Sequence, residues 1–237
     1  MAREWGKPSY RACAFLDVEG SSSRSDLAQE HVARHKYEVV QEALDAAGLS
    51  AGDTKYDRGD GILLVFEPTV SKVDVTEALT VRLGSELRRF AALHSAEGAM
   101  RMRIALHAGD ITHTGHGWSG RAVNTTFRLA EAEITRKRLA LARECPLVAI
   151  VSDHWYQAVI REGYGLLNAD SYEKVHVTYK EFDETAWISL PDNSAPRHHD
   201  PAAPPGSSSG GIVFHGPVTH HGDNVAGSKI VYGRDTP

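Results

Sequence analysis

Two aspartates stand at the ends of apolar runs, from where a carboxylate can hold a divalent cation. Asp17 closes the apolar run of CAFLDVEGSS, and Asp60 lies in the polar turn of YDRGDGILLVF. Backbone N–H groups of an adjoining loop rich in Gly and Ser can face a phosphate beside such a cation. Each aspartate taken singly is more often a turn or capping residue, so their joint context has to decide. Together they could build a two-metal clamp.

A second pair of polar residues has helical spacing. Asn124 and Arg128 are four residues apart in GRAVNTTFRLAEA, so a helix presents them on one face, one turn apart. An amide can hold a sugar or phosphate oxygen, and a guanidinium can stabilise the charge of a phosphoryl transition state. This spacing is also common on solvated helices and carries little weight alone.

An alternation of strands and helices would position these residues. Apolar residues recur at three- to five-residue steps from Val32 to Leu44, which predicts a helix over 26–47 that ends at Gly48, and Ser152 is a good N-cap for a later helix. We predict helices over 26–47, 70–93, 121–133 and 152–161, and strands over 10–17, 54–56, 62–66, 101–107, 110–114, 147–151, 175–179 and 185–190. Glycines beside aspartates predict hairpins joining 54–56 to 62–66 and 101–107 to 110–114.

Composition excludes several classes of function. The 237 residues include 26 Lys and Arg against 31 Asp and Glu, a net charge of −5, which argues against binding nucleic acid through bulk positive charge. Two distant cysteines, Cys13 and Cys145, give no disulfide framework and fit a reducing cytosol. The apolar stretches are strand-sized, and the start has no apolar leader segment, so we expect a soluble cytoplasmic protein without a membrane span.

The composition changes near Pro191. Residues 191–211 hold five of the ten prolines and almost no apolar side chains, which predicts a linker. Residues 212–237 are rich in Gly and His and contain short β-branched runs, which predicts a β-prone tail that could engage a partner. We therefore expect one α+β catalytic domain over residues 1–190, followed by this linker and tail.

The order of four motifs along this domain is typical of one protein family. FLDVEGS, GDGILLVF, MRIALHAGDI and GRAVNTTFRLAEA together resemble the catalytic domain of class III nucleotidyl cyclases, over roughly residues 8–190. The resemblance implies an α+β fold derived from the ferredoxin-like arrangement, with a mixed, largely antiparallel sheet covered by helices. It also implies a head-to-tail homodimer with shared active sites.

The resemblance assigns roles to individual residues. Asp17 and Asp60 match the two metal-binding aspartates of the family, which hold two Mg²⁺ or Mn²⁺ ions. Arg103 matches an arginine that contacts the phosphates, and Lys180, in VTYKEFDETAWISL, matches a lysine that binds the triphosphate. The last of these is the least sharp match.

The helical pair also has counterparts in the family. Asn124 matches the residue that orients the ribose, and Arg128 matches the residue that neutralises charge on the α-phosphate in the transition state. In the family the aspartates come from one chain and this helix from the other, so the resemblance implies that a single chain is inactive.

The base pocket departs from the purine-specific pattern. Tyr56 and Gly117 stand where such cyclases carry a lysine and an aspartate or similar polar residue, and Lys55 is one place too early, which in a strand means the opposite face. Tyr56 leaves less room for a two-ring base, and Arg121 can donate to pyrimidine carbonyls. These features resemble the pyrimidine cyclases of bacterial anti-phage Pycsar systems, which make cyclic UMP or cyclic CMP.

The sequence thus predicts a metal-dependent uridylate or cytidylate cyclase, and UTP is favoured only as the commoner substrate that the resemblance suggests. Its product would be a second messenger for a separate effector protein. A purine cyclase with an unusual base pocket is the alternative within the same class. The alternative from another class is a non-catalytic adaptor, in which a cyclase fold dimerises and the tail recruits a partner by β-assembly.

Overall fold

The structure is a computed structural model that describes residues 6–20, 24–49, 55–58, 61–95, 98–179 and 181–191, with residues 55–58 described through their backbone. Its strands are β1 (Ser9–Val18), β2 (Lys55–Arg58), β3 (Gly61–Phe66), β4 (Met102–His113), β5 (Trp118–Ser119), β6 (Leu147–Ser152), β7 (Tyr172–Tyr179) and β8 (Phe182–Ser189). Its helices are α1 (Asp26–Asp45), α2 (Lys72–Glu77), the π-helical η3 (Ala78–Arg82), α3 (Leu83–Leu93), α4 (Arg121–Glu131), α5 (Glu133–Leu141), α6 (Asp153–Trp155), the π-helical η4 (Tyr156–Ile160) and the 3₁₀ turn η5 (Ala169–Ser171).

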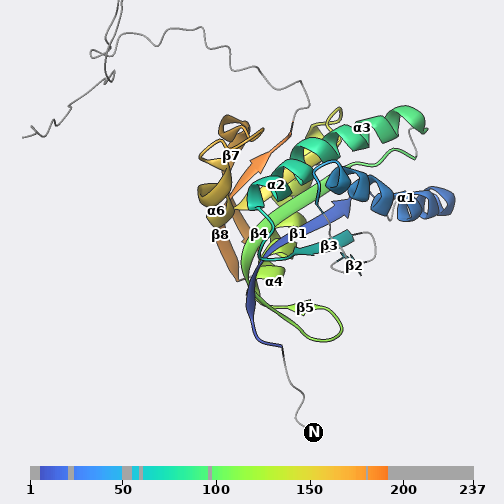
Figure 1. Ribbon diagram of the computed structural model, residues 1–237. Helices are drawn as coiled ribbons and strands as arrows, with labels where there is room; N and C mark the ends of the chain where they lie inside the picture. Colours follow the sequence, from blue (N-terminus) through green and yellow to red (C-terminus); the bar gives the residue numbers. More distant parts are fainter. Residues whose placement is uncertain are drawn as a thin grey trace, which may run out of the picture. The chain divides into compact units, whose positions relative to one another are not determined.

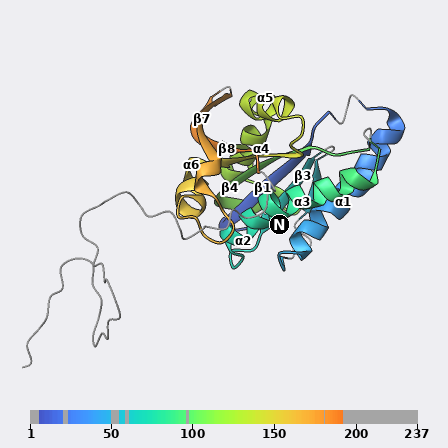
Figure 2. The same ribbon diagram turned by 90° about the horizontal axis from the view of Figure 1, so that it is seen from above.

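One mixed sheet runs through the described part of the chain. Its strands lie in the order β2-β3-β1-β4-β6-β8-β7, and β5 pairs with β4 beside this path. The β4–β6 pair is parallel and the other pairs are antiparallel. Strand β1 is therefore an interior strand, between β3 and β4, and helices cover both faces of the sheet (Figure 1; Figure 2).

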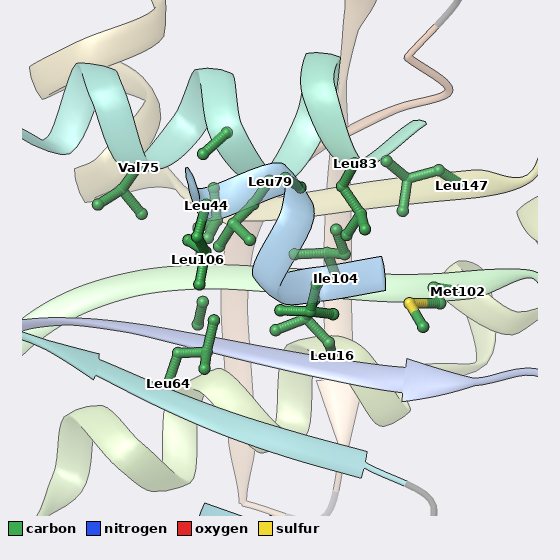
Figure 3. Packing of buried hydrophobic residues seen from close by; sticks show 14 of the residues in the cluster. Leu16, Leu44, Leu64, Val75, Leu79, Leu83, Met102, Ile104, Leu106 and Leu147 are labelled. Atoms are coloured by element: carbon green, nitrogen blue, oxygen red, sulfur yellow. The ribbon is translucent and has the colours of Figure 1, made fainter. Parts of the chain in front are cut away.

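One hydrophobic core lies on the sheet face that carries α1, the α2–η3–α3 helix and α6–η4. Alternate residues of β1, β3 and β4 point into it, as the two-residue period of a strand requires. Figure 3 shows this packing, with Leu16, Leu64, Ile104 and Leu106 of the sheet beneath Leu44, Leu79 and Leu83 of the helices.

A second core lies on the opposite face, under α4 and α5. It takes the other set of alternate residues, including Cys13 and Phe15 of β1, Ala105 of β4, and Ala122 and Leu129 of α4. Burial in this core raises the pKa of the Cys13 thiol to about 12, so this cysteine is an inert packing residue. A central strand buried on both faces explains why β1 reads as a continuous apolar run.

Most of the predicted elements are confirmed. Helix α1 begins at the predicted residue and ends at Asp45, two residues before the predicted end, with Ser25 as its N-cap and Gly48 at φ +68° shortly beyond it. Ser152 caps α6 as predicted, because its Oγ accepts a hydrogen bond from the backbone N–H of Trp155 at 3.2 Å. The segment predicted as one helix over 70–93 is formed by α2, η3 and α3 in succession.

The predicted hairpin between residues 101–107 and 110–114 is wrong. Strand β4 continues through Gly109, which pairs with Arg11 of β1, and the chain turns back later into β5. Gly109 is needed there for packing, because a Cβ at this position would lie 2.9 Å from the Cβ of Ala122 in α4. The glycine that looked like a turn signal is a close contact between sheet and helix.

Several boundaries differ from the prediction, among them the starts of β7 and β8, which lie at Tyr172 and Phe182 rather than at 175 and 185. Residues 57 and 58, expected in a turn, extend β2, so the β2–β3 hairpin is tighter than predicted. The helix predicted over 121–133 ends at Glu131, and Ala132 adopts an extended conformation before α5 begins. Thr135 fixes this break by donating its hydroxyl to the carbonyl of Leu129 at 2.9 Å. Helix α5 was not predicted.

The predicted linker and tail lie outside the described residues, apart from Pro191. No helix in the described ranges is both long enough and apolar enough to cross a bilayer.

Candidate functional site

The site is built around Asp17, near the end of the central strand β1. Asp17 is aligned with Gly61 of β3 on one side and with Arg103 of β4 on the other. It is only 9% exposed, which is rare for a carboxylate without a partner. The register of β1, β3 and β4 therefore places Asp17, a predicted metal ligand, between Gly61 and Arg103. Gly61 follows Asp60 in the chain, and Arg103 is the predicted phosphate contact.

Arg103 supplies the partner of this buried carboxylate. The Nη2 of Arg103 forms an ion pair with Oδ2 of Asp17, and the two side chains are only 13% and 12% exposed. The Nε of Arg103 is buried and has no hydrogen-bond partner among the described residues. A buried donor without a partner is costly, and an anionic oxygen could satisfy it.

A second ion pair fixes the chain that follows β1. Arg101 contacts Glu19 with 2.7 Å between Nη1 and Oε2, and it also donates to the carbonyls of Ala142 at 2.9 Å and Cys145 at 3.1 Å. The backbone N–H of Glu19 donates to the carbonyl of Arg101 at 2.8 Å. The strand end carrying Asp17 is thereby tied to the end of α5.

Helix α4 carries the second predicted pair. Asn124 and Arg128 lie one turn apart on it, with Asn124 exposed and Arg128 half-buried. The guanidinium of Arg128 lies over the ring of Phe182 in β8, with 5.6 Å from Cζ to the ring centroid. This cation–π contact orients Arg128. Phe182 was not among the predicted site residues, because its contact with Arg128 depends on the packing of α4 against β8.

Two of the three predicted base-reading residues, Arg121 and Gly117, lie in the described part of the chain. Arg121 is exposed as the first residue of α4. Gly117 lies in the β4–β5 turn, where its φ of +146° favours glycine and its carbonyl accepts hydrogen bonds from the N–H and hydroxyl of Thr114 at 2.8 and 3.0 Å. Gly117 thus has a role in the turn itself.

Three further predicted site residues fall in places that the structure does not describe. Asp60 and Lys180 lie outside the described residues, as does the side chain of Tyr56. The backbone of Tyr56 pairs with Leu63 and that of Lys55 with Leu64, and these two leucines belong to the cores on opposite faces. Positions 55 and 56 therefore lie on opposite faces of the sheet, as predicted.

A divalent cation is compatible with the donors present. No group of three or more His, Cys, Asp or Glu residues in the described part of the chain is arranged to hold a metal ion. A magnesium site that also binds nucleotide needs fewer, because one or two carboxylates suffice when substrate phosphates and water complete the shell. The oxygen donor of Asp17, at a strand end beside the buried donor of Arg103, fits such a shared site.

Comparisons with known proteins identify the fold. No protein-family model matches the sequence, and no curated protein matches it. Three solved structures are similar: the guanylyl cyclase Cya2 (TM-score 0.55, 19% identity, covering 78% of this chain and 92% of that one), an adenylate/guanylate cyclase/hydrolase from Silicibacter pomeroyi (0.54, 19%, 78% and 100%), and the guanylate cyclase domain of RhGC from Catenaria anguillulae (0.52, 16%, 78% and 100%). The chain has the α+β fold of class III nucleotidyl cyclases, as the motifs predicted.

Proposed function

We propose that the protein is a cytoplasmic nucleotidyl cyclase that converts UTP, or else CTP, into the 3′,5′-cyclic monophosphate and diphosphate. The product would be a second messenger that activates a separate effector protein in anti-phage defence. The fold is that of cyclases, and the motifs that carry the predicted site residues occupy the central strands and the helix packed on them.

The observation that carries the proposal is the placement of Asp17. A carboxylate is held at the end of a buried central strand, in register with Arg103 and with the residue that follows Asp60. An arginine with one donor on the carboxylate and another buried donor without a described partner suits a place where a triphosphate comes close to metal-binding aspartates.

The residues would divide the work as follows. Asp17 and Asp60 would hold Mn²⁺ or Mg²⁺, which when bound lowers the pKa of the ribose 3′-hydroxyl and neutralises the triphosphate. Arg103 and Lys180 would bind phosphate oxygens. Asn124 would orient the ribose, and Arg128 would stabilise the charge that develops on the α-phosphate.

The reaction is an in-line displacement at the α-phosphorus. The 3′-oxygen forms a bond to this phosphorus while its proton passes to solvent water. The bond from the phosphorus to the bridging oxygen breaks, and its electron pair leaves with the diphosphate. The guanidinium of Arg128, oriented over Phe182, would contact the equatorial oxygens that gain charge in this step.

The active unit would be a head-to-tail homodimer. In the arrangement that the resemblance implies, Asp17 and Asp60 of one chain act with Asn124 and Arg128 of the other. Asn124 is exposed and Arg128 half-buried on α4, so both can reach a second chain. A single chain would then hold two incomplete half-sites.

The choice of base rests on Tyr56. Position 56 lies in β2, on the sheet face opposite to that of position 55, so Lys55 does not replace a base-reading lysine. A purine substrate is the second candidate, because one similar structure is a guanylate cyclase domain in complex with GTP. The two candidates share the fold and the chemistry and differ in the base alone.

The test is incubation of the purified protein with Mn²⁺ and each of ATP, GTP, CTP and UTP, followed by mass spectrometry of the products. Cyclic UMP or cyclic CMP supports the proposal, and cyclic AMP or cyclic GMP replaces the pyrimidine assignment by the purine one. The Asp17→Ala protein is the control, and product from it would show that the activity comes from another site or a contaminant.

The non-catalytic alternative predicts a different outcome. A chain that ends before residue 191 keeps the sheet and both cores, so an enzyme should retain its turnover. An adaptor that works through residues 212–237 should lose its function in the same truncation. Absence of product from all four nucleotides in the full chain would favour the adaptor.

A further inference from the structure

An aromatic pair links the strand that carries Asp17 to the helix that carries Arg128. Phe15 of β1 and Phe127 of α4 pack edge to face, with ring centroids 4.7 Å apart and planes at 75°. Phe15 is 6% exposed and lies two residues before Asp17, so both side chains are on the same face of β1. Phe127 directly precedes Arg128.

The same phenylalanine also touches the hairpin that carries Asp60. A Cβ placed on Gly61 would lie 2.4 Å from Cζ and 2.5 Å from Cε2 of Phe15, so the ring of Phe15 covers this glycine. Gly61 pairs with Asp17 and directly follows Asp60 in the chain. One ring is thus in contact with the start of β3 on one side and with α4 on the other.

We propose that Phe127, acting through Phe15, is a positioning residue for the carboxylate of Asp17 in its own chain. The inference rests on the proposed function, because it assigns Asp17 and Asp60 to metal binding. Phe127 holds Phe15, and Phe15 holds the backbone at Gly61, which fixes β3 against β1 where Asp17 lies. Small displacements of metal-binding or reacting groups are costly, so this support matters for activity as well as for stability.

In the proposed head-to-tail dimer, the residues of one chain are shared between two active sites. Within one chain, Arg128 would serve one active site of the dimer, while Asp17 and Asp60 would serve the other. Phe127 lies on the helix of the first site and positions Asp17, which belongs to the second. A substitution at Phe127 should therefore impair a site to which its own helix contributes nothing.

Phe127→Leu is the test variant, and Phe90→Leu is the matched control. Phe90 is also a buried phenylalanine on a helix, 8% exposed, but it belongs to the core on the other face and stacks on His94. The first readout is hydrogen exchange of the β2–β3 segment, residues 55–66, which needs no turnover. We expect faster exchange there in Phe127→Leu and not in Phe90→Leu, and equal exchange in the two variants would overturn the inference.

The second readout uses dimers of two differently tagged chains. One chain carries Asp17→Ala and the other Arg128→Ala, so one active site stays complete, with its aspartates from the Arg128→Ala chain. Adding Phe127→Leu to that Arg128→Ala chain should raise the Mn²⁺ concentration for half-maximal activity by roughly tenfold. An effect confined to Phe127→Leu in the Asp17→Ala chain would overturn the inference, because Phe127 would then act only on its own helix.

A compensating pair checks the contact at Gly61. Gly61→Ala should weaken Mn²⁺ activation of the homodimer, and Phe15→Leu in the same chain should restore part of it by making room for the new methyl group. Lack of any restoration would count against Phe15 as the link. If the wild-type dimer makes no cyclic product from any nucleotide, the proposed function fails, and the hydrogen-exchange comparison still decides whether Phe127 holds the hairpin.

Discussion

Asp17 and Arg103 face each other across the β1–β4 ladder, and their nearly buried side chains form an ion pair. Removing one partner of a buried pair is costly, because the other charge is left without compensation. The proposed function gives Asp17 a second partner, a divalent cation. Unfolding measurements with and without the cation distinguish the contribution of Arg103 to stability from that of a metal bound at Asp17.

The Arg103→Ala protein should be less stable than the wild type by roughly 3 kcal/mol in EDTA, because Asp17 loses its counter-charge. Added Mn²⁺ should restore part of this loss, since a cation bound to Asp17 replaces the missing positive charge. Urea unfolding with EDTA or with Mn²⁺ measures both values. Arg101→Ala is the control, because Arg101 pairs with Glu19 and its loss should not be relieved by Mn²⁺. An equal Mn²⁺ effect in both variants would contradict metal binding at Asp17.

The Arg128→Ala protein should lose roughly 10²- to 10³-fold in kcat with little change in KM, because a group that acts mainly in the transition state lowers kcat when it is removed. Steady-state kinetics with saturating Mn²⁺ provides both constants. Lys137→Ala on α5, at an exposed lysine paired with Glu133, should match the wild type. A rise in KM at constant kcat would show that Arg128 only binds substrate.

The Tyr56→Lys protein should use UTP and CTP less well, by about tenfold or more in kcat/KM, because the base pocket loses the ring and hydroxyl assigned to pyrimidine recognition. Competition between UTP and ATP in one reaction, read by mass spectrometry, gives the preference directly. Lys55→Ala is the neighbouring control, since position 55 lies on the opposite face of the sheet. Unchanged preference in Tyr56→Lys would remove Tyr56 from the base pocket.

His107 predicts a pH dependence of stability. Burial, with a smaller contribution from His154, lowers the pKa of His107 to about 4. In the unfolded chain the pKa of this histidine is near 6.5, so between pH 6.5 and 4 the unfolded state binds more protons than the folded state. The stability that the neutral His107 allows is therefore fully present above pH 6.5 and is lost as the pH falls toward 4. We expect the wild type to lose about 2 kcal/mol from this residue between pH 7 and pH 5. Urea unfolding of the wild type and of His107→Gln should show a flatter profile in the variant, and parallel profiles would contradict the assignment.

Local signals predicted most of the elements because the chemistry that fixes them is local. The cap at Ser152 and the glycine after α1 depend on neighbouring residues, and both are confirmed. Gly109 was misread because its role is a contact with Ala122 of α4, which depends on tertiary packing. Helix α5 follows a break set by the hydrogen bond from Thr135 to Leu129, a contact that periodicity does not reveal.

In the candidate site, too, local motifs predicted single residues, whereas the contacts between them depend on the fold. The motifs predicted Asp17 and Arg103 separately, one for metal and one for phosphate. Their ion pair joins residues 86 positions apart through strand register, which the sequence alone does not specify. The metal-binding role of Asp17 and the phosphate-binding role of Arg103 stay predictions, as do the roles of Asn124, Arg128, Asp60, Lys180 and the base-reading residues. Phe127 was missed because an aromatic residue inside a helix reads as ordinary core.

The sheet ends at β7, which in the described part of the chain pairs with β8 alone. Charged or titratable side chains stand exposed on both faces of this outer strand, at Glu173, Lys174 and His176. Glu173 is held by Arg138 and His176 by Asp183, at 2.5 Å in each pair. Charges on an edge strand oppose the addition of further strands from other molecules. These charges therefore disfavour the formation of a continuous intermolecular sheet at this edge. Two chains can associate through other surfaces without aggregating through β7.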